Sequence, residues 1–150
     1  MAEFTYDPVQ LIAAGGYAIF NTTIDCPKGY VIPRNESGLV ILRGIVNNRC
    51  ASSARYQVTF NGNIALPEGA TVGPISVALA VDGIPIQTST AEVTPAAVDN
   101  YFNVTSTAII DVPRGCCFNL GVANTSTGTT TNPPINLKNA NLVISRMRDA

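Results

Sequence analysis

The residues of this chain best equipped for chemistry are its four cysteines, two of which, Cys116 and Cys117, are adjacent. A thiolate can bind a metal ion, form a disulfide or attack an electrophile. The segment "CCFNL" continues as an alternating strand, in which neighbouring side chains point to opposite faces. We therefore expect Cys116 to point inward with Phe118 and Leu120, and Cys117 to point outward beside Asn119.

Three roles are open for these thiols. The favoured one is packing, because a free cysteine behaves as a small apolar side chain. The second is a disulfide to Cys26 or Cys50, since a bond between Cys116 and Cys117 themselves would need a contorted backbone. The third is a zinc site, which would require Cys26 and Cys50 to converge on the adjacent pair without the help of C-x₂-C spacing. We expect neither a metal site nor a cofactor.

Other catalytic groups are scarce. The chain has no histidine, which excludes Ser-His-Asp and Cys-His centres and histidine metal sites. The ten acidic residues are scattered and show no EF-hand spacing, and neither a P-loop nor a G-x-G-x-x-G motif is present. Arg146 and Arg148 form the one basic cluster, which we interpret as a solvated strand end. These patterns predict a protein that is not an enzyme.

Composition narrows the class further. The 150 residues fit one domain, and 13% of them are charged, against about 25% in an average globular protein. Much of the surface is therefore uncharged, which favours an oligomer that hides part of it. A net charge of −1 without a basic run predicts no nucleic-acid partner. We expect no membrane span and no signal peptide, and hence synthesis in a reducing bacterial cytoplasm.

Period-two alternation of apolar and polar residues dominates the chain and predicts strands. The segments that show it are residues 55–62, 75–81, 101–110, 117–123 and 140–147. Residues 39–46 are apolar on both faces except at Arg43, which predicts a strand covered on both sides. We expect turns at Asn61-Gly62, Pro67–Gly69, Asp82-Gly83 and Pro113–Gly115, and at most one helical turn, within residues 94–100. About eight strands with such turns predict an all-β, antiparallel jelly-roll sandwich.

The first sixteen residues differ from the rest because they show no sustained alternation and end in Ala-Ala-Gly-Gly. We expect residues 1–16 to form an N-terminal arm and residues 17–150 to form a complete jelly-roll domain without it. An apolar arm can dock on a neighbouring protein by adding a strand or lying in a groove. The candidate attachment residues are Phe4, Tyr6, Val9, Leu11 and Ile12.

Several motifs resemble those of known proteins. The strand "RYQVTF", the "VDGIPI" hairpin, the "VPRG" turn and the closing strand "NANLVI" resemble the tumour-necrosis-factor-like jelly roll over roughly residues 39–148. This group includes complement-type globular heads and the heads of collagen-like bacterial spore-surface glycoproteins. More narrowly, "LRGIVNN", "TPAAVDNYFNV" and "VPRGCC" resemble small virion proteins of bacteriophages and prophages of gut bacteria. The chain departs from the collagen-stalked heads in having no Gly-x-y segment.

The resemblance implies a non-enzymatic bacteriophage structural protein, located in the virion, that decorates the capsid or forms a head spike or fibre. It implies a homotrimer whose further partner is a capsid or other virion protein. The candidate interface residues are Leu39, Ile41, Arg43, Ile45 and Tyr101. The alternative is a receptor- or glycan-binding jelly-roll module on a phage or bacterial surface. We rank it second because the chain has no Trp and the 124–136 loop has no aromatic residue to serve as a sugar platform.

Overall fold

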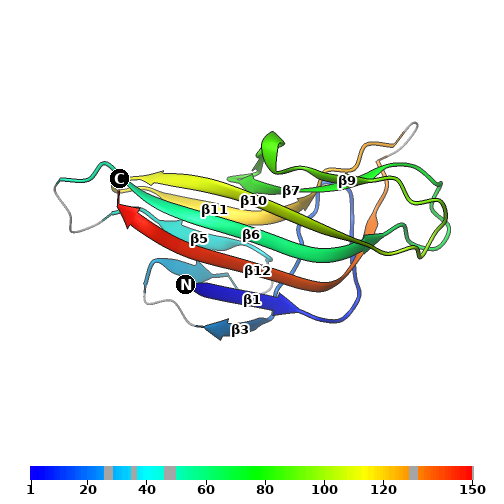
Figure 1. The fold of residues 1–150 in the computed structure, drawn as a ribbon, viewed down its shortest axis with the longest axis horizontal. Helices are drawn as coiled ribbons and strands as arrows, with labels where there is room; N and C mark the ends of the chain where they lie inside the picture. Colours follow the sequence, from blue (N-terminus) through cyan, green and yellow to red (C-terminus); the bar gives the residue numbers. More distant parts are fainter. Residues whose placement is uncertain (26–28, 35–36, 46–49, 129–131, 150) are drawn as a thin grey trace.

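The computed structural model describes residues 1–25, 29–34, 37–45, 50–128 and 132–149. In this part of the chain, two six-stranded antiparallel sheets pack face to face (Figure 1). The first sheet contains β1 (Ala2–Tyr6), β2 (Gln10–Ile12), β3 (Thr22–Asp25), β6 (Ser53–Ala65), β10 (Phe102–Pro113) and β12 (Ile135–Asp149). The second contains β4 (Val31–Pro33), β5 (Val40–Arg43), β7 (Ile75–Val81), β8 (Ile84–Pro85), β9 (Ala91–Val93) and β11 (Cys117–Asn124).

The strand order of each sheet joins segments far apart in the sequence. The order in the first sheet is β10-β6-β12-β1-β3, with β2 also paired to β12. In the second it is β4-β5-β11-β7-β8, with β9 also paired to β7. This arrangement is the expected all-β, antiparallel jelly-roll sandwich. In the described part of the chain no helix is long and apolar enough to cross a membrane.

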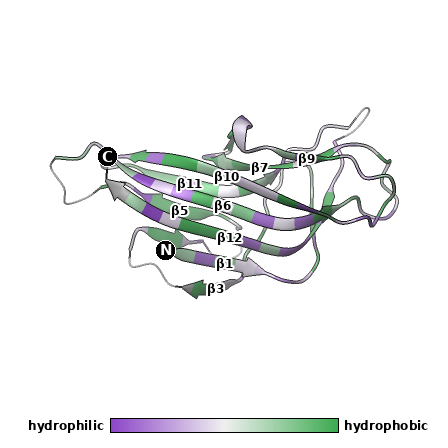
Figure 2. Ribbon diagram, in the orientation of Figure 1, coloured by the Kyte–Doolittle hydropathy of each residue, from purple (hydrophilic) through white to green (hydrophobic). Residues whose placement is uncertain are grey.

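The core lies between the two sheets and is built by strand alternation, visible as alternating green and purple bands along the ribbons (Figure 2). Within the alternating segments, every second apolar side chain faces the core and most of these side chains are buried, as shown by Tyr56, Phe60 and Leu120. Phe102 is an exception, with 41% of its surface exposed, because it lies at the very start of β10. Cys116, expected to point inward, is also exposed.

The N-terminal residues belong to the first sheet, so the boundary expected between residues 16 and 17 is wrong. β1 lies between β12 and β3 (Figure 1), with Phe4 paired to Leu142 and to Thr23. Ala2, Phe4 and Ile12 are buried in the common core. Strands of five and three residues carry too little periodicity to be recognised, and they are stabilised by the long β12 beside them.

The turn predicted at Asp82-Gly83 is confirmed, whereas the one predicted at Asn61-Gly62 is wrong. Asp82 and Gly83 have φ values of 50° and 83° and connect β7 to β8 as the expected tight hairpin. Gly62, expected in a turn, lies inside β6 instead; a Cβ there would come within 2.7 Å of the Leu137 Cδ1 atom, so glycine allows β12 to approach. Residues 94–100 contain no helical turn, and a short 3₁₀ helix, η1, spans Gln87–Ser89.

Candidate functional site

The thiols described by the structure lie on the surface, which confirms the outward orientation expected for Cys117 and contradicts the burial expected for Cys116. Cys50, Cys116 and Cys117 are all exposed. Cys116 precedes β11 and donates its backbone N–H to the Pro113 carbonyl at 3.1 Å, so it belongs to the turn and not to the strand. Cys26 lies outside the described residues. Within them, no group of three or more metal-binding side chains of His, Cys, Asp or Glu is assembled.

The residues expected to form an attachment arm are divided between core and surface. Phe4 and Ile12 are buried and therefore cannot dock on another protein. Tyr6 packs partly against the core. Val9 and Leu11 are 54% and 66% exposed, beside and within the short β2, and remain available to a partner.

The residues expected at a trimer interface do not form one patch. Ile41 and Arg43 are partly exposed on β5 of the second sheet, so within one subunit the outer side of this strand is only partly covered. Ile45 is only 2% exposed and belongs to the core, so its side chain cannot contact another subunit. Leu39 lies near Gly121 on the second sheet, whereas Tyr101 lies beside the first sheet, where the Lys138 Nζ is 4.0 Å from its ring centroid.

Arg146 is not part of a solvated strand end. Its guanidinium lies 3.7 Å from the centroid of the Tyr30 ring and 6.0 Å from that of Tyr56. The Tyr56 hydroxyl in turn donates its proton to the Arg43 carbonyl and lies 3.3 Å from the Tyr30 carbonyl oxygen. Arg146 therefore packs at the end of the core between the two sheets. Nothing is described of the Arg148 side chain.

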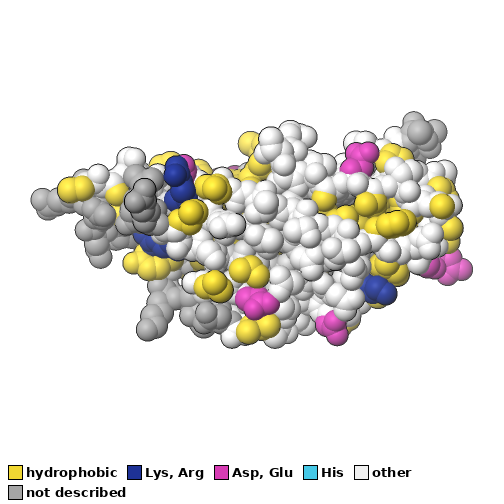
Figure 3. All heavy atoms as spheres, viewed as in Figure 1, with side chains coloured by type: hydrophobic (Ala, Val, Ile, Leu, Met, Phe, Trp, Pro, Cys, Tyr) yellow, Lys and Arg dark blue, Asp and Glu magenta, His cyan; other side chains and the backbone are white. Residues whose placement is uncertain are grey.

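The outer face of the first sheet, turned away from the core, consists mainly of uncharged polar side chains. Its uncharged members on β6, β10 and β12 are Gln57, Thr59, Asn61, Asn63, Asn103, Thr105, Thr107, Ile109, Asn136, Asn141, Val143 and Ser145. The same alternation also places Arg55, Asp111 and Lys138 on this face, toward its two ends. Figure 3 shows this face as a broad neutral surface, with charged groups confined to a few places. We call it the neutral face.

Hydrogen bonds between strands order the neutral face. The Asn103 Nδ2 donates to the Asn61 Oδ1 at 3.0 Å, and the Thr105 hydroxyl donates to the same oxygen at 3.1 Å. The hydroxyls of Thr59 and Thr107 are 3.3 Å apart. These side chains thus satisfy one another across β6 and β10, and their conformations are fixed before any partner arrives.

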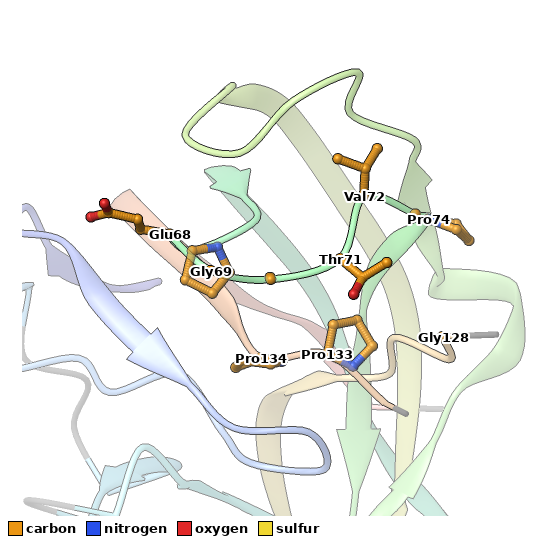
Figure 4. Close-up of a pocket in the computed structure, with 11 residues that line it drawn as sticks. Glu68, Gly69, Thr71, Val72, Pro74, Gly128, Pro133 and Pro134 are labelled. Carbon is orange, nitrogen blue, oxygen red and sulfur yellow. The ribbon is translucent and has the colours of Figure 1, made fainter. Parts of the chain in front are cut away.

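One hollow lies at the loop end of the sandwich and has a volume of about 320 Å³. It is lined by residues 67–74 together with Gly128, Pro133 and Pro134. Figure 4 shows Thr71 and Pro133 facing one another, whereas the Glu68 carboxylate points away from them. The hollow therefore gathers few polar side chains that could orient a ligand.

A larger groove, of about 490 Å³, crosses the second sheet. Backbone and small side chains of Ser76, Ala123 and Asn124 contribute to its lining. The other residues that line it are Gly15, Tyr17, Gly83, Pro85, Gln87, Thr90, Glu92, Thr125, Ser126, Thr127 and Asn132. We call it the Tyr17 groove. Its described lining combines one aromatic ring, one carboxylate, amides and hydroxyls, and contains no Lys or Arg.

Tyr17 is the residue that sequence reasoning missed. The 124–136 loop has no aromatic residue of its own, but Tyr17 pairs with Ala123 and thereby lies next to that loop. A Cβ at Gly121 would lie 2.5 Å from the Tyr17 Cδ1 atom, so the ring packs directly on the glycine backbone. A glycine within a strand pattern is the available signal, because it often marks a close approach.

Comparisons with known proteins support the fold. The globular domain of zebrafish complement 1qA protein matches with a TM-score of 0.63 at 10% identity, over 99% of this chain and 97% of that one. Two weaker matches are the sugar-binding EclA C-terminal domain (TM-score 0.37, 20% identity, 71% and 76% coverage) and CBM35 from Cellvibrio japonicus Abf62 (TM-score 0.33, 14% identity, complete coverage). No protein-family model and no curated protein matches this chain.

Proposed function

We propose that this chain is a non-enzymatic structural protein of a bacteriophage virion, which assembles as a homotrimer and decorates the capsid or forms a head spike or fibre. The observation that carries the self-association in this proposal is the neutral face, a broad sheet surface with few charged side chains. The complement-like jelly-roll fold is compatible with it.

The neutral face is suited to self-association for a physical reason. Burying a charged group is costly unless it is paired, whereas several of these amides and hydroxyls, such as those of Asn61, Asn103 and Thr105, already have partners within the subunit. Ile109, 61% exposed in the middle of β10, adds apolar surface that gains from being covered. A standard interface buries about 800 Å² on each partner, which is a modest part of the 7845 Å² accessible surface of one subunit.

The charged groups near the neutral face are each engaged within the subunit. Arg55 pairs with Asp111, Lys138 lies over the Tyr101 ring, and Glu3 accepts a hydrogen bond from Asn141. A neighbouring subunit would therefore meet one neutralised ion pair, together with a single cation and a single carboxylate that are already held by contacts within the subunit. A three-fold assembly joins two different patches on adjacent subunits, so the exposed part of the β5 surface, at Ile41 and Arg43, remains a candidate for the opposing patch.

The virion role rests on the sequence resemblance alone. Because residues 2–12 are built into the first sheet, we assign attachment to the exposed Val9 and Leu11 and to the loops, not to a projecting arm. Electron cryomicroscopy of virions made with and without this gene tests the proposal. We expect three-fold density on the wild-type particle that is missing from the deletion. Identical maps, with the protein absent from purified particles, would contradict it.

The second candidate function is a receptor- or glycan-binding module. The observation that favours it is the Tyr17 groove, which places an aromatic ring among groups able to bind hydroxyls.

A further inference from the structure

We propose that the Tyr17 groove binds a neutral saccharide of one or two sugar rings. The inference rests on the second candidate function, and it does not depend on trimer formation. The groove volume of about 490 Å³ lies within the range of about 300–1,000 Å³ typical of small-molecule sites.

The lining has the chemistry that sugar hydroxyls require. Each hydroxyl both donates and accepts hydrogen bonds. The exposed amides of Gln87 and Asn132 offer both kinds of group, the Glu92 carboxylate accepts, and the Thr90 hydroxyl does either. The Tyr17 ring supplies the flat apolar surface against which the C–H face of a sugar can pack.

Charge limits the ligand to neutral sugars. Glu92 contributes a negative charge to the groove, and no Lys or Arg is among the described residues that line it. A phosphorylated or carboxylated sugar would bring a second negative charge without a cation to neutralise it, and like charges repel most strongly where water is partly excluded.

The groove is built in advance of any ligand. The Ser76 and Thr125 hydroxyls are 2.8 Å apart, and the Ser76 N–H donates to the Ser126 hydroxyl at 2.9 Å. The segment that carries Tyr17 is fixed to β11, because the Ala18 N–H donates to the Val122 carbonyl at 2.8 Å. A site whose walls are already ordered loses less conformational entropy when it binds.

The experiment titrates the purified full-length protein with D-glucose, D-galactose, N-acetyl-D-glucosamine, lactose and cellobiose at millimolar concentrations. Saturation-transfer difference NMR reports contact, and amide shifts of the labelled protein locate it. We expect saturable shifts with at least one sugar, confined to residues 15–18, 83–92 and 123–127. Absence of saturable binding by all five, or shifts located elsewhere, would overturn the proposal.

Variants then assign the site. Tyr17→Ala and Gln87→Ala should each weaken binding about tenfold, equivalent to about 1.4 kcal/mol, while Tyr17→Phe retains it. Tyr101→Ala, which removes an aromatic ring beside the first sheet, is the matched control and should bind normally. Gln87 is exposed, so its variant keeps the test valid if Tyr17→Ala fails to fold. Equal weakening by Tyr17→Ala and Tyr101→Ala would contradict the assignment.

A charged probe and a monomeric variant complete the test. Glucose 6-phosphate should bind no better than glucose, and tighter binding would overturn the restriction to neutral sugars. Ile109→Lys, on the opposite sheet, should bind sugar normally even if the trimer is lost. Failure of the saccharide site is therefore distinguishable from failure of the proposed assembly.

Discussion

The guanidinium of Arg55 on β6 donates two hydrogen bonds to the carboxylate of Asp111 on β10, with Nε 2.7 Å from Oδ1 and Nη2 2.8 Å from Oδ2. The two residues are directly paired in the sheet register, at one end of the neutral face. The hydrogen bonds from Arg55 lower the pKa of Asp111 below its ordinary value of 3.8.

The first prediction concerns pH. A carboxylate whose pKa is lower in the folded than in the unfolded state stabilises the fold above the unfolded pKa, and this contribution is lost as the pH falls through the folded value. The urea midpoint of the wild type should therefore exceed that of Asp111→Asn at pH 7, by a small margin because the pair is exposed, and the difference should vanish well below pH 3.8. Arg55→Gln should remove this pH dependence. A difference that grows on acidification would refute it.

The second prediction concerns the N-terminal strand. Phe4 is 1% exposed in the core, so Phe4→Ala should lower the free energy of unfolding by about 3–5 kcal/mol. Removal of residues 2–14 should abolish the native fold, because the sheet loses β1 and β2. Val9→Ala, exposed near the same strands, is the control and should change stability by less than about 0.5 kcal/mol. A deletion variant with native stability, measured by urea denaturation, would be incompatible with this fold.

The third prediction concerns Arg146. Its stacking on Tyr30 combines a cation–π contact with packing of the aliphatic stem, so Arg146→Ala should cost about 1–2 kcal/mol of unfolding free energy. Arg34→Ala, at an exposed position, serves as the control and should be near neutral. Equal effects of the two substitutions in chemical denaturation would show that Arg146 contributes no more than a surface side chain.

The fourth prediction concerns the exposed thiols. Cys116→Ser and Cys117→Ser should each change the unfolding free energy by less than about 0.5 kcal/mol, since both side chains lie on the surface. Both native thiols should react promptly with a thiol-specific reagent before any unfolding. If Cys116 reacts only in denaturant, or its serine variant is strongly destabilised, the residue is buried after all.

The long strands were predictable from sequence because their alternation reports directly on a two-layer core. Tyr56, Val58 and Phe60 on β6 illustrate this, and all three are buried. Short strands were not predictable, since β1 and β2 acquire their structure from pairing with β12, more than a hundred residues away. The turn predicted at Asn61-Gly62 was wrong for a related reason. An Asn-Gly pair is typical of a turn, but here the glycine lies within a strand and makes room for Leu137.

The candidate sites depended still more on long-range contacts. Cys116 lies one residue before β11, in the preceding turn. Strand alternation therefore does not apply to its side chain, which is exposed where the strand pattern predicted burial. The aromatic residue of the groove could not be found in the 124–136 loop, because Tyr17 reaches it by pairing with Ala123. The absence of histidine, in contrast, can be read directly from the sequence and needs no knowledge of the fold.

Sedimentation equilibrium at micromolar concentration tests self-association through the neutral face most directly. The wild type should sediment as a single species of three times the 15.7 kDa chain mass. Ile109→Lys, which puts a charge at a 61% exposed position of that face, should sediment as the monomer. Ile84→Lys, at a 73% exposed isoleucine of the second sheet, should remain trimeric. A monomeric wild type, or an Ile109→Lys trimer as stable as the wild type, would contradict the account.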